Sequence, residues 1–374
     1  MKQGWEIKKL GEVATYVNGY AFKPEHWGET GMPIIRIQNL NNPNAEYNYC
    51  DADIPEKFVV ENGDILISWS ASLGVYEWNR GKAYLNQHIF KVVFNKVDIN
   101  KYFLKYAVNA KLNEMLKDAH GATMKHIVKG DFDNTIIPYP SRVEQERIVA
   151  ELDCLSGVIE KKREQLKQLD ALAQSIFYQM FGDPITNEKV WEVKKVKDVA
   201  PQQEYKGDVP CVDGKYWLLN LDMVIPNTGE IIEKCYFDYD EIGNSTIIFN
   251  TDNVLYSKLR PYLNKVVIPN DIGYGTSELV PLKPHKDLLN KVFFASLLRS
   301  SYFVKYISGK VAGAKMPRVA MGEFREFAVI LPPLALQQEF ADKIEAIEKQ
   351  KELIKQSITQ TEELFNSRMD YYFN

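Results

Sequence analysis

Three residues of the chain have the types and the order of a nuclease metal site. A nuclease core needs a metal-binding aspartate followed by a Glu-x-Lys element on a strand, and Asp183 precedes Glu192-Val193-Lys194. An earlier Glu6-Ile7-Lys8 has no acidic residue before it. Glu-x-Lys therefore follows the fold and not a metal, and a nuclease that uses Asp183, Glu192 and Lys194 is kept only as an alternative.

Other catalytic chemistry also lacks its signature. The segment Leu331-Pro332-Pro333-Leu334 has neither the amide nor the aromatic residue of an adenine methyltransferase motif. The chain has no GxxxxGK(S/T) loop for nucleotide phosphates, and its histidines and cysteines have no metal-ligand spacing. We therefore expect no catalytic residue, no metal site and no cofactor in this chain.

The compartment follows from the cysteines and the apolar stretches. The four cysteines form no CxxC pair, which is typical of reduced thiols in a cytoplasmic protein. The N-terminal MKQGWEIKKL lacks the apolar core of a secretory signal. The apolar stretches, such as 292–298, are far shorter than the ~20 residues that span a bilayer. We expect a cytoplasmic protein with no membrane partner.

Polar and aromatic side chains on predicted loops could instead bind DNA, since such groups contact phosphates and base edges. The candidates in the first half are Arg36, Gln38, Asn39, Trp69, Ser70, Ser72, Gln87, His88, Lys125 and His126. Those in the second half are Tyr256, Lys258, Arg260, Tyr262, Ser277, Lys315 and Arg318. Arg260 is the best candidate for a bidentate contact to guanine. The alternative for Arg36, Gln38 and Asn39 is that they satisfy backbone groups at a strand end.

The distribution of charge agrees with local DNA binding. The 374 residues carry 46 basic and 50 acidic side chains, a net charge of −4. Residues 1–140 are balanced at 16 and 16, and residues 183–333 at 19 and 19. The segment 288–322 has six basic residues and no acidic one, which predicts a phosphate-binding strip or, alternatively, a solvated helix face.

Internal repetition determines the expected architecture. WEIKKLGEVA at 5–14 is answered by WEVKKVKDVA at 191–200, and GATMKHI at 121–127 by GAKMPRV at 313–319. The chain is thus one unit of ~190 residues used twice. The first part of each unit, which we call its head, contains strand patterns such as Pro33–Leu40, Asp64–Trp69 and Ala328–Leu331. Helical stretches near 100–118 and 287–308 are interspersed with these strands, so each head is expected to be α+β.

A long helix follows each head. Apolar residues alternate at steps of four and three, as in the seam of a coiled coil. The predicted seam is Ile148, Leu152, Leu155, Ile159, Leu166, Leu169, Phe340, Ile344, Ile347, Ile354, Ile358 and Phe365. Antiparallel pairing would place one head at each end and relate the halves by a pseudo-two-fold axis. The expected domains are heads at 1–140 and 183–333 and helices at 141–182 and 334–374.

These motifs resemble the DNA-specificity subunit of type I restriction–modification systems. The resemblance rests on the opening WEIKKLGEV at 5–13, IRIQNL at 35–40, GDIL at 63–66, the prolines before EQERI at 144–148, and MFGDP at 180–184. It implies that each head is a target-recognition domain for one half of an asymmetric bipartite site in double-stranded DNA. It also implies that the helices set the spacer and dock two methyltransferase subunits.

Further partners follow from the same resemblance. Restriction and translocase subunits would join through the complex, and S-adenosylmethionine, ATP and Mg would be bound by the partner subunits and not by this chain. The alternative of a different class is a coiled-coil adaptor whose heads bind protein, which composition alone leaves open.

Overall fold

The structure is a computed structural model that describes residues 4–70, 72–118, 128–243, 246–313 and 316–374. The chain divides into two compact units. Unit 1 consists of Met1–Lys161 and Ser357–Asn374, and unit 2 of Lys162–Gln356. Each unit therefore contains one head, the first part of the helix that follows it and the last part of the other long helix.

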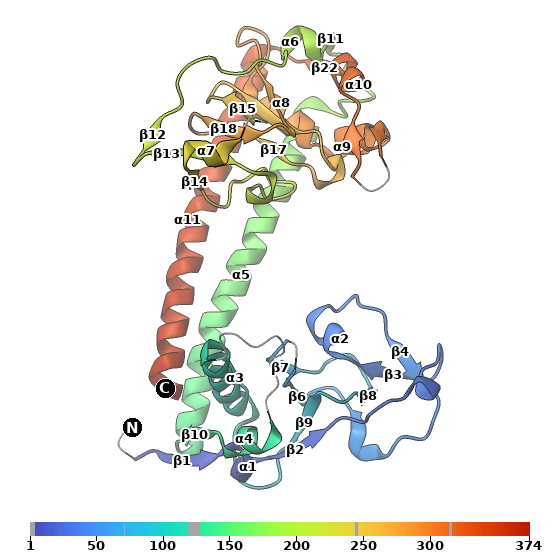
Figure 1. The fold of residues 1–374 in the computed structure, drawn as a ribbon, viewed down its shortest axis with the longest axis vertical. Helices are drawn as coiled ribbons and strands as arrows, with labels where there is room; N and C mark the ends of the chain where they lie inside the picture. The colour runs from blue at the N-terminus through green and yellow to red at the C-terminus, as the bar shows by residue number, and fades with distance from the viewer. Residues whose placement is uncertain (1–3, 71, 119–127, 244–245, 314–315) are drawn as a thin grey trace. The chain divides into compact units, whose positions relative to one another are not determined.

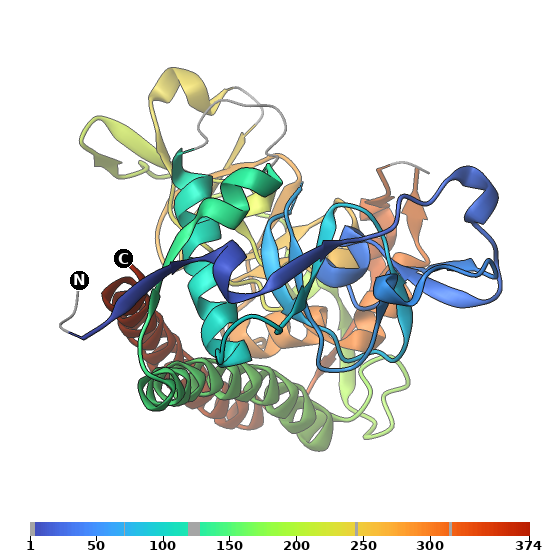
Figure 2. The ribbon, with the colours of Figure 1, turned by 90° about the horizontal axis from the view of Figure 1, so that it is seen from below.

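The head of unit 1 is built on two four-stranded sheets, ordered β2-β9-β6-β7 and β4-β3-β8-β5, and on the antiparallel pair β1-β10 (Figures 1 and 2). Its strands are β1 (Glu6–Lys9), β2 (Thr15–Asn18), β3 (Met32–Ile35), β4 (Asn48–Cys50), β5 (Val59–Val60), β6 (Ile65–Ser68), β7 (Gly74–Glu77), β8 (Ala83–Leu85), β9 (Ile89–Val93) and β10 (Ile136–Tyr139). Its helices are α1 (Leu10–Val13), α2 (Ile37–Asn41), α3 (Lys101–Asp118) and α4 (Lys129–Asn134).

The head of unit 2 contains the sheets β17-β16-β19 and β12-β13-β18-β15, with β14 paired to β13, and the pairs β11-β22 and β20-β21. Its strands are β11 (Glu192–Lys195), β12 (Cys211–Val212), β13 (Lys215–Leu219), β14 (Tyr236–Phe237), β15 (Thr246–Phe249), β16 (Val254–Ser257), β17 (Val266–Val267), β18 (Gly273–Thr276), β19 (Leu279–Leu282), β20 (Val311–Ala312), β21 (Arg318–Val319) and β22 (Ala328–Leu331). Its helices are α6 (Val196–Val199), α7 (Tyr239–Ile242), α8 (Lys291–Arg299), α9 (Ser301–Ser308) and α10 (Met321–Glu326).

The same local structures recur in both heads. The first strand of each head pairs antiparallel with its last strand, β1 with β10 and β11 with β22. The two central strands also correspond: β6 pairs with β9 through Ser68 and Ile89, and β16 with β19 through Ser257 and Leu279. The repeat in the sequence is therefore a repeat of backbone structure.

One predicted strand is shorter than expected. The pattern at Pro33–Leu40 forms β3 only to Ile35, and α2 begins at Ile37. The side-chain oxygen of Asn39 accepts the Arg36 backbone N–H at 3.0 Å and so satisfies a free donor at the helix start. An apolar alternation alone does not reveal this short capped helix.

The two long helices are α5 (Arg142–Phe181) and α11 (Leu334–Phe373). In unit 1 the Tyr372 hydroxyl donates to Glu151 at 2.6 Å and accepts from Arg147 at 3.2 Å. In unit 2 the Lys351 ammonium lies 2.8 Å from Asp170. Later residues of α5 thus meet earlier residues of α11, so the two helices pack antiparallel. Together with the sheets and short helices of both heads, they confirm the predicted α+β fold class.

All twelve predicted seam residues are buried or half-buried. Several of them also enter a head core. Ile148 and Leu152 pack with Phe103 and Phe373 in unit 1, and Phe340 packs with Phe293 in unit 2. The seam is therefore continuous with the cores of the heads.

A buried glutamine anchors each head to the start of its long helix. Gln145 accepts the backbone N–H of Asn100 at 2.8 Å and donates to the Pro140 carbonyl at 2.9 Å. Gln337 makes the equivalent bonds to Asn290 at 2.9 Å and to Pro332 at 2.7 Å. Both glutamines have no exposed surface, and each amide group satisfies one buried and one part-buried backbone group.

Candidate nucleic-acid interface

Three loops of the head in unit 2 meet at the carboxyl end of β16. The Lys258 N–H donates to the Glu278 carbonyl at 3.0 Å, and its own carbonyl accepts from Val319 at 2.9 Å. The Arg260 N–H donates to the Pro317 carbonyl at 2.8 Å. We call the loop after β16, the β18–β19 turn and the segment 316–319 the loop cluster of head two. Backbone hydrogen bonds fix this cluster, so its side chains extend from a rigid frame.

Five of the candidates from the sequence lie in or beside this loop cluster: Lys258, Arg260, Tyr262, Ser277 and Arg318. Arg260, Ser277 and Arg318 are exposed, Lys258 is half-buried, and Tyr262 has 54% of its surface exposed. Arg260 has the left-handed backbone angle φ of 49°, which turns the chain into the short helix Pro261–Leu263. The cluster presents cations and one aromatic ring to solvent, which are the groups that bind DNA backbones and bases.

Arg318 is held by a carboxylate of the same cluster. Its Nε lies 3.0 and 3.3 Å from the two carboxyl oxygens of Glu278, and its Nη2 lies 2.8 Å from Oε1. The side chain of Arg318 is 47% exposed and that of Glu278 22% exposed. Because the two residues lie forty positions apart, the sequence alone does not predict this pair.

Two candidates from the sequence are parts of the core. Tyr256 is 3% exposed and stacks on Phe324 with ring centroids 4.5 Å apart, and burial raises the pKa of its hydroxyl. Asn39 has no exposed surface, and its amide donates to the carbonyls of Ala45 and Glu46. The alternative reading of Asn39 as a structural residue is the better one, and we exclude both residues from the interface.

The loops of the head in unit 1 have the same frame with different side chains. The Trp69 N–H donates to the His88 carbonyl at 3.3 Å, as Lys258 does to Glu278. The hydroxyls of Ser68 and Ser257 each donate to a carbonyl two residues later, at 3.3 and 3.0 Å. The Trp69 and His88 rings lie 4.9 Å apart. An aromatic pair thus occupies the place that charged residues occupy in head two.

The remaining candidates of the first head differ in their surroundings. Arg36 lies over the Trp27 ring at 4.9 Å and donates to Asn48 at 3.1 Å, while Gln38 is exposed on the helix next to it. Ser70 is buried, Gln87 is half-buried and Ser72 is exposed. Lys125, His126 and Lys315 lie outside the described residues.

The basic strip of head two is smaller than its sequence suggests. The guanidinium of Arg299 donates twice to the Val266 carbonyl, at 3.0 and 2.6 Å, and burial lowers its pKa to about 10. Lys310 lies 3.4 Å from Glu323, whereas Lys305 is exposed. Arg299 therefore stabilises the fold and does not contribute to a phosphate-binding surface.

The nuclease alternative finds no support in the geometry. Asp183 caps a turn by accepting the Ile185 N–H at 2.7 Å, and Lys194 lies 3.3 Å from Glu192 on the same strand. Within the described part of the chain, no group of three or more His, Cys, Asp or Glu side chains could hold a metal ion. Likewise, none of the helices described is both long and apolar enough to cross a bilayer.

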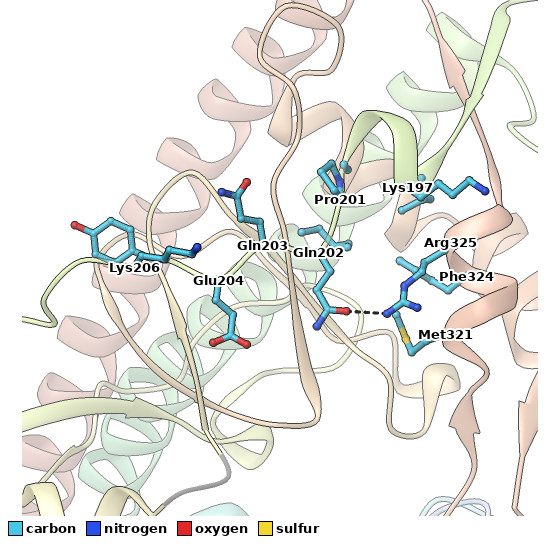
Figure 3. A pocket seen from close by; sticks show the side chains of 13 residues that line it. Lys197, Pro201, Gln202, Gln203, Glu204, Lys206, Met321, Phe324 and Arg325 are labelled. Atoms are coloured by element: carbon cyan, nitrogen blue, oxygen red, sulfur yellow. Dashed lines mark hydrogen bonds between the residues drawn. The ribbon is translucent and has the colours of Figure 1, made fainter.

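An open cavity of about 760 Å³ lies beside α6 and α10 of unit 2 (Figure 3). Gln202 accepts from Arg325 at 3.3 Å across its wall, and Lys197 is paired with Glu326. In unit 1 the corresponding stretch is the strand β2. In unit 2 Pro201 has no N–H for a ladder, and Gln202 forms an isolated bridge to Leu282. The cavity thus marks a local difference between the repeats.

Comparison with known proteins agrees with this geometry. Residues 2–171 and 188–363 match the type I restriction modification DNA specificity domain, once in each half. The specificity subunit of the type I restriction enzyme MjaIX from Methanocaldococcus jannaschii is 26% identical over 387 residues, which cover 92% of this chain and 86% of that protein. The EcoDI specificity subunit of Escherichia coli is 20% identical over 76% of this chain and 70% of its own length.

Solved structures share the fold. The S subunit of a type I restriction-modification system from M. genitalium has a TM-score of 0.58 and 13% identity over 99% of this chain and 96% of that one. A chain from a structure of a type I restriction-modification system has a TM-score of 0.60 and 16% identity over 99% of this chain and 97% of that one. The fold and the repeated loops define a two-headed DNA-recognition protein. The chain belongs to the family of type I restriction-modification DNA specificity subunits, the subunits that recognise DNA and do not catalyse.

Proposed function

We propose that each head reads one half of an asymmetric bipartite site in double-stranded DNA. Residues 1–140 and 183–333 are the proposed target-recognition domains. The observation that carries this proposal is the shared loop frame after β6 and β16, on which Trp69 and His88 replace Lys258 and Glu278. Because the backbone of these loops is the same and the side chains differ, the two heads recognise different short base sequences, which we call words.

The helices at 141–182 and 334–374 are the proposed spacer. Each long helix has 40 residues, which corresponds to about 60 Å at ~1.5 Å per residue. That length exceeds one turn of B-DNA, about 34–36 Å. It suits a protein that reads two words separated by base pairs it does not contact.

The same helices dock two methyltransferase subunits in this proposal. Leu172, Leu353 and Leu364 are 46%, 66% and 50% exposed on the helices, and the helical segments hold the net acidic charge, at 6 basic and 7 acidic residues in 141–182 and 5 and 8 in 334–374. These leucines are apolar surface that a docked partner would bury. The duplication of the chain suits two copies of one partner.

Catalysis belongs to the partners. The methyltransferase subunits supply S-adenosylmethionine, and restriction or translocase subunits that join the complex use ATP and Mg. We propose that the assembly acts in the cytoplasm, in keeping with the four cysteines, which are all free thiols.

Selection from random DNA tests this proposal. The full chain, assembled with its methyltransferase subunits, is incubated with a random duplex library, and the bound molecules are amplified and sequenced. The expected result is one enriched sequence with two short words and a fixed, unread spacer. Enrichment of a single uninterrupted word, or no enrichment by an assembled complex, would contradict it.

A further inference from the structure

The Arg318–Glu278 pair leaves one edge of the arginine available. A guanidinium has five N–H donors in a planar fork. Glu278 occupies the Nε edge, through Nε at 3.0 Å and Nη2 at 2.8 Å. The opposite edge, formed by Nη1 and the second Nη2 hydrogen, keeps two parallel donors. Two parallel donors match the O6 and N7 acceptors of guanine in the major groove.

Both residues are fixed by the backbone of the loop cluster. The Glu278 carbonyl accepts from Lys258, and the Lys258 carbonyl accepts from Val319, the neighbour of Arg318. Leu259 and Arg318 also form an antiparallel bridge. The pair therefore joins two loops whose main chains are already tied to a third, so the arginine loses little freedom when it binds a base.

A carboxylate beside bound DNA repels phosphates and lowers affinity. Its presence is explained if it contributes to specificity. Arg260 in the same cluster has no such partner among the described residues. Its exposed side chain suits a phosphate contact. Arg318 carries less net positive charge at its site because Glu278 neutralises it, and this favours base readout over phosphate binding.

The first head has different residues at the equivalent positions. The strand pairing aligns Glu278 with His88, and the GAKMPRV segment aligns Arg318 with His126. The identity of this residue pair changes while the frame at the described positions is kept. Positions of this kind are where two heads of one design come to read different bases.

We propose that Glu278 is a positioning residue that holds Arg318 for an end-on bidentate contact to one guanine in the half-site of head two. The proposal rests on the proposed function above. It identifies a specificity-determining pair, with Arg318 as the residue that contacts the base and Glu278 as its support. Arg260, which the sequence favoured for the guanine contact, is assigned to the DNA backbone instead.

The test repeats the selection with E278Q and R318K in the full chain assembled with its methyltransferase subunits. Both variants should lose preference for guanine at the same single position of one word, with the other word unchanged. For R318K the preference should fall by about 5- to 150-fold, which corresponds to the ~1–3 kcal/mol of one bidentate pair. For E278Q the fall should be smaller, while affinity for random DNA rises, because a charge that repels phosphate is removed.

Asp252→Asn is the matched control. Asp252 also pairs with a basic residue, Lys286 at 2.9 Å, but precedes β16 at the strand end opposite to the loop cluster. This variant should keep both words. Thermal unfolding of each variant checks that the head is intact, and affinity for random DNA supplies a second readout.

The outcomes separate the two proposals. If the unaltered complex selects no bipartite sequence, the proposed function fails. If it does select one, and E278Q and R318K keep both words with only a uniform change in affinity, Arg318 contacts phosphate and the inference alone is overturned. Loss of preference in R318K with an unchanged word in E278Q would overturn the positioning role of Glu278.

Discussion

At the scale of single residues, burial and hydrogen-bond partners distinguish the residues proposed to bind DNA from those that stabilise the fold. Arg318 and Arg299 belong to the same basic segment. Arg318 is exposed beside Glu278, whereas the guanidinium of Arg299 donates two hydrogen bonds to the Val266 carbonyl. Tyr256 and Tyr262 lie six residues apart, one in the core and one on the surface. The same residue type therefore has opposite environments within one head.

The buried glutamines give a first prediction. Gln145→Ala and Gln337→Ala should each lower the free energy of unfolding by about 1–3 kcal/mol, because each leaves buried backbone groups without a partner. Urea unfolding followed by circular dichroism measures the change. Gln165→Ala, at an exposed position of α5, is the control. Losses no larger than the control would show that the glutamines do not anchor the helices.

The pH dependence of stability provides a second prediction. Hydrogen bonds from Lys195 and Lys197, each at 2.5 Å, lower the pKa of Glu326 from 4.5 to about 2. A lowered pKa in the folded state means that the stabilisation is present above about pH 4.5 and is lost as the pH falls toward 2.

Glu326→Gln should therefore flatten the fall of Tm between pH 4.5 and 2. Calorimetric scans at several pH values measure this, with Asp208→Asn, an exposed carboxyl of the same head, as control. An unchanged acid profile in the Glu326 variant would show that these ion pairs do not affect folding.

The sequence could predict the loops but not the fate of each side chain on them. It correctly indicated that the segments after β6 and β16 are equivalent, since their motifs recur in order. It could not tell that Tyr256 is buried, because β16 is covered on both faces and its alternation carries no signal. The Glu278–Arg318 pair joins residues forty positions apart, and single-sequence patterns do not report such contacts.

At the scale of elements, the long helices were the most predictable part. The steps of three and four fixed their position, and α5 and α11 begin and end within a few residues of the predicted bounds. The pattern does not give the partners of Lys351, which is 5% exposed and lies between Asp170 at 2.8 Å and Glu348 at 3.0 Å. A buried charge in a helical seam favours one register over others.

A double substitution tests this register device. Asp170→Asn leaves the buried ammonium with one carboxylate and should cost about 1–2 kcal/mol, since Asp170 is itself 40% exposed. Lys351→Met added to it should restore or exceed the original stability, because an apolar side chain needs no partner. Urea unfolding measures both.

The control for this pair is an exposed one on the same helix. Lys349 and Glu345 pair at 2.8 Å with 74% and 65% of their side chains exposed, and Lys349→Met should change stability by less than about 0.5 kcal/mol. If the Asp170→Asn variant were no less stable than this control, the buried contact would not support the seam.

The proposed spacer role of the helices leads to another prediction. Deleting seven residues from each helix at matching positions removes about 10 Å of helix. The unread spacer of the selected DNA should shorten by at most about three base pairs at ~3.4 Å each, and both words should persist. Selection from random DNA measures the spacer. A changed word with an unchanged spacer length would contradict the proposed spacer role of the helices.

At the scale of the whole molecule, the distribution of charge follows the duplicated organisation of the chain. The net charge of −4 falls entirely in the helical segments, while each head is balanced. A neutral head with local cations binds DNA through chosen contacts and not through bulk charge. The acidic helices are better suited to protein partners. The repeat could be recognised from the sequence because its motifs recur in the same order in both halves.

Head duplication tests the central claim most directly, namely that each head reads its own word. Residues 183–333 are replaced by a second copy of residues 1–140, and the chain, assembled with its methyltransferase subunits, selects from random DNA. We predict that the asymmetric site becomes one word present twice, in inverted orientation because α5 and α11 are antiparallel. Retention of the original asymmetric site would contradict the account.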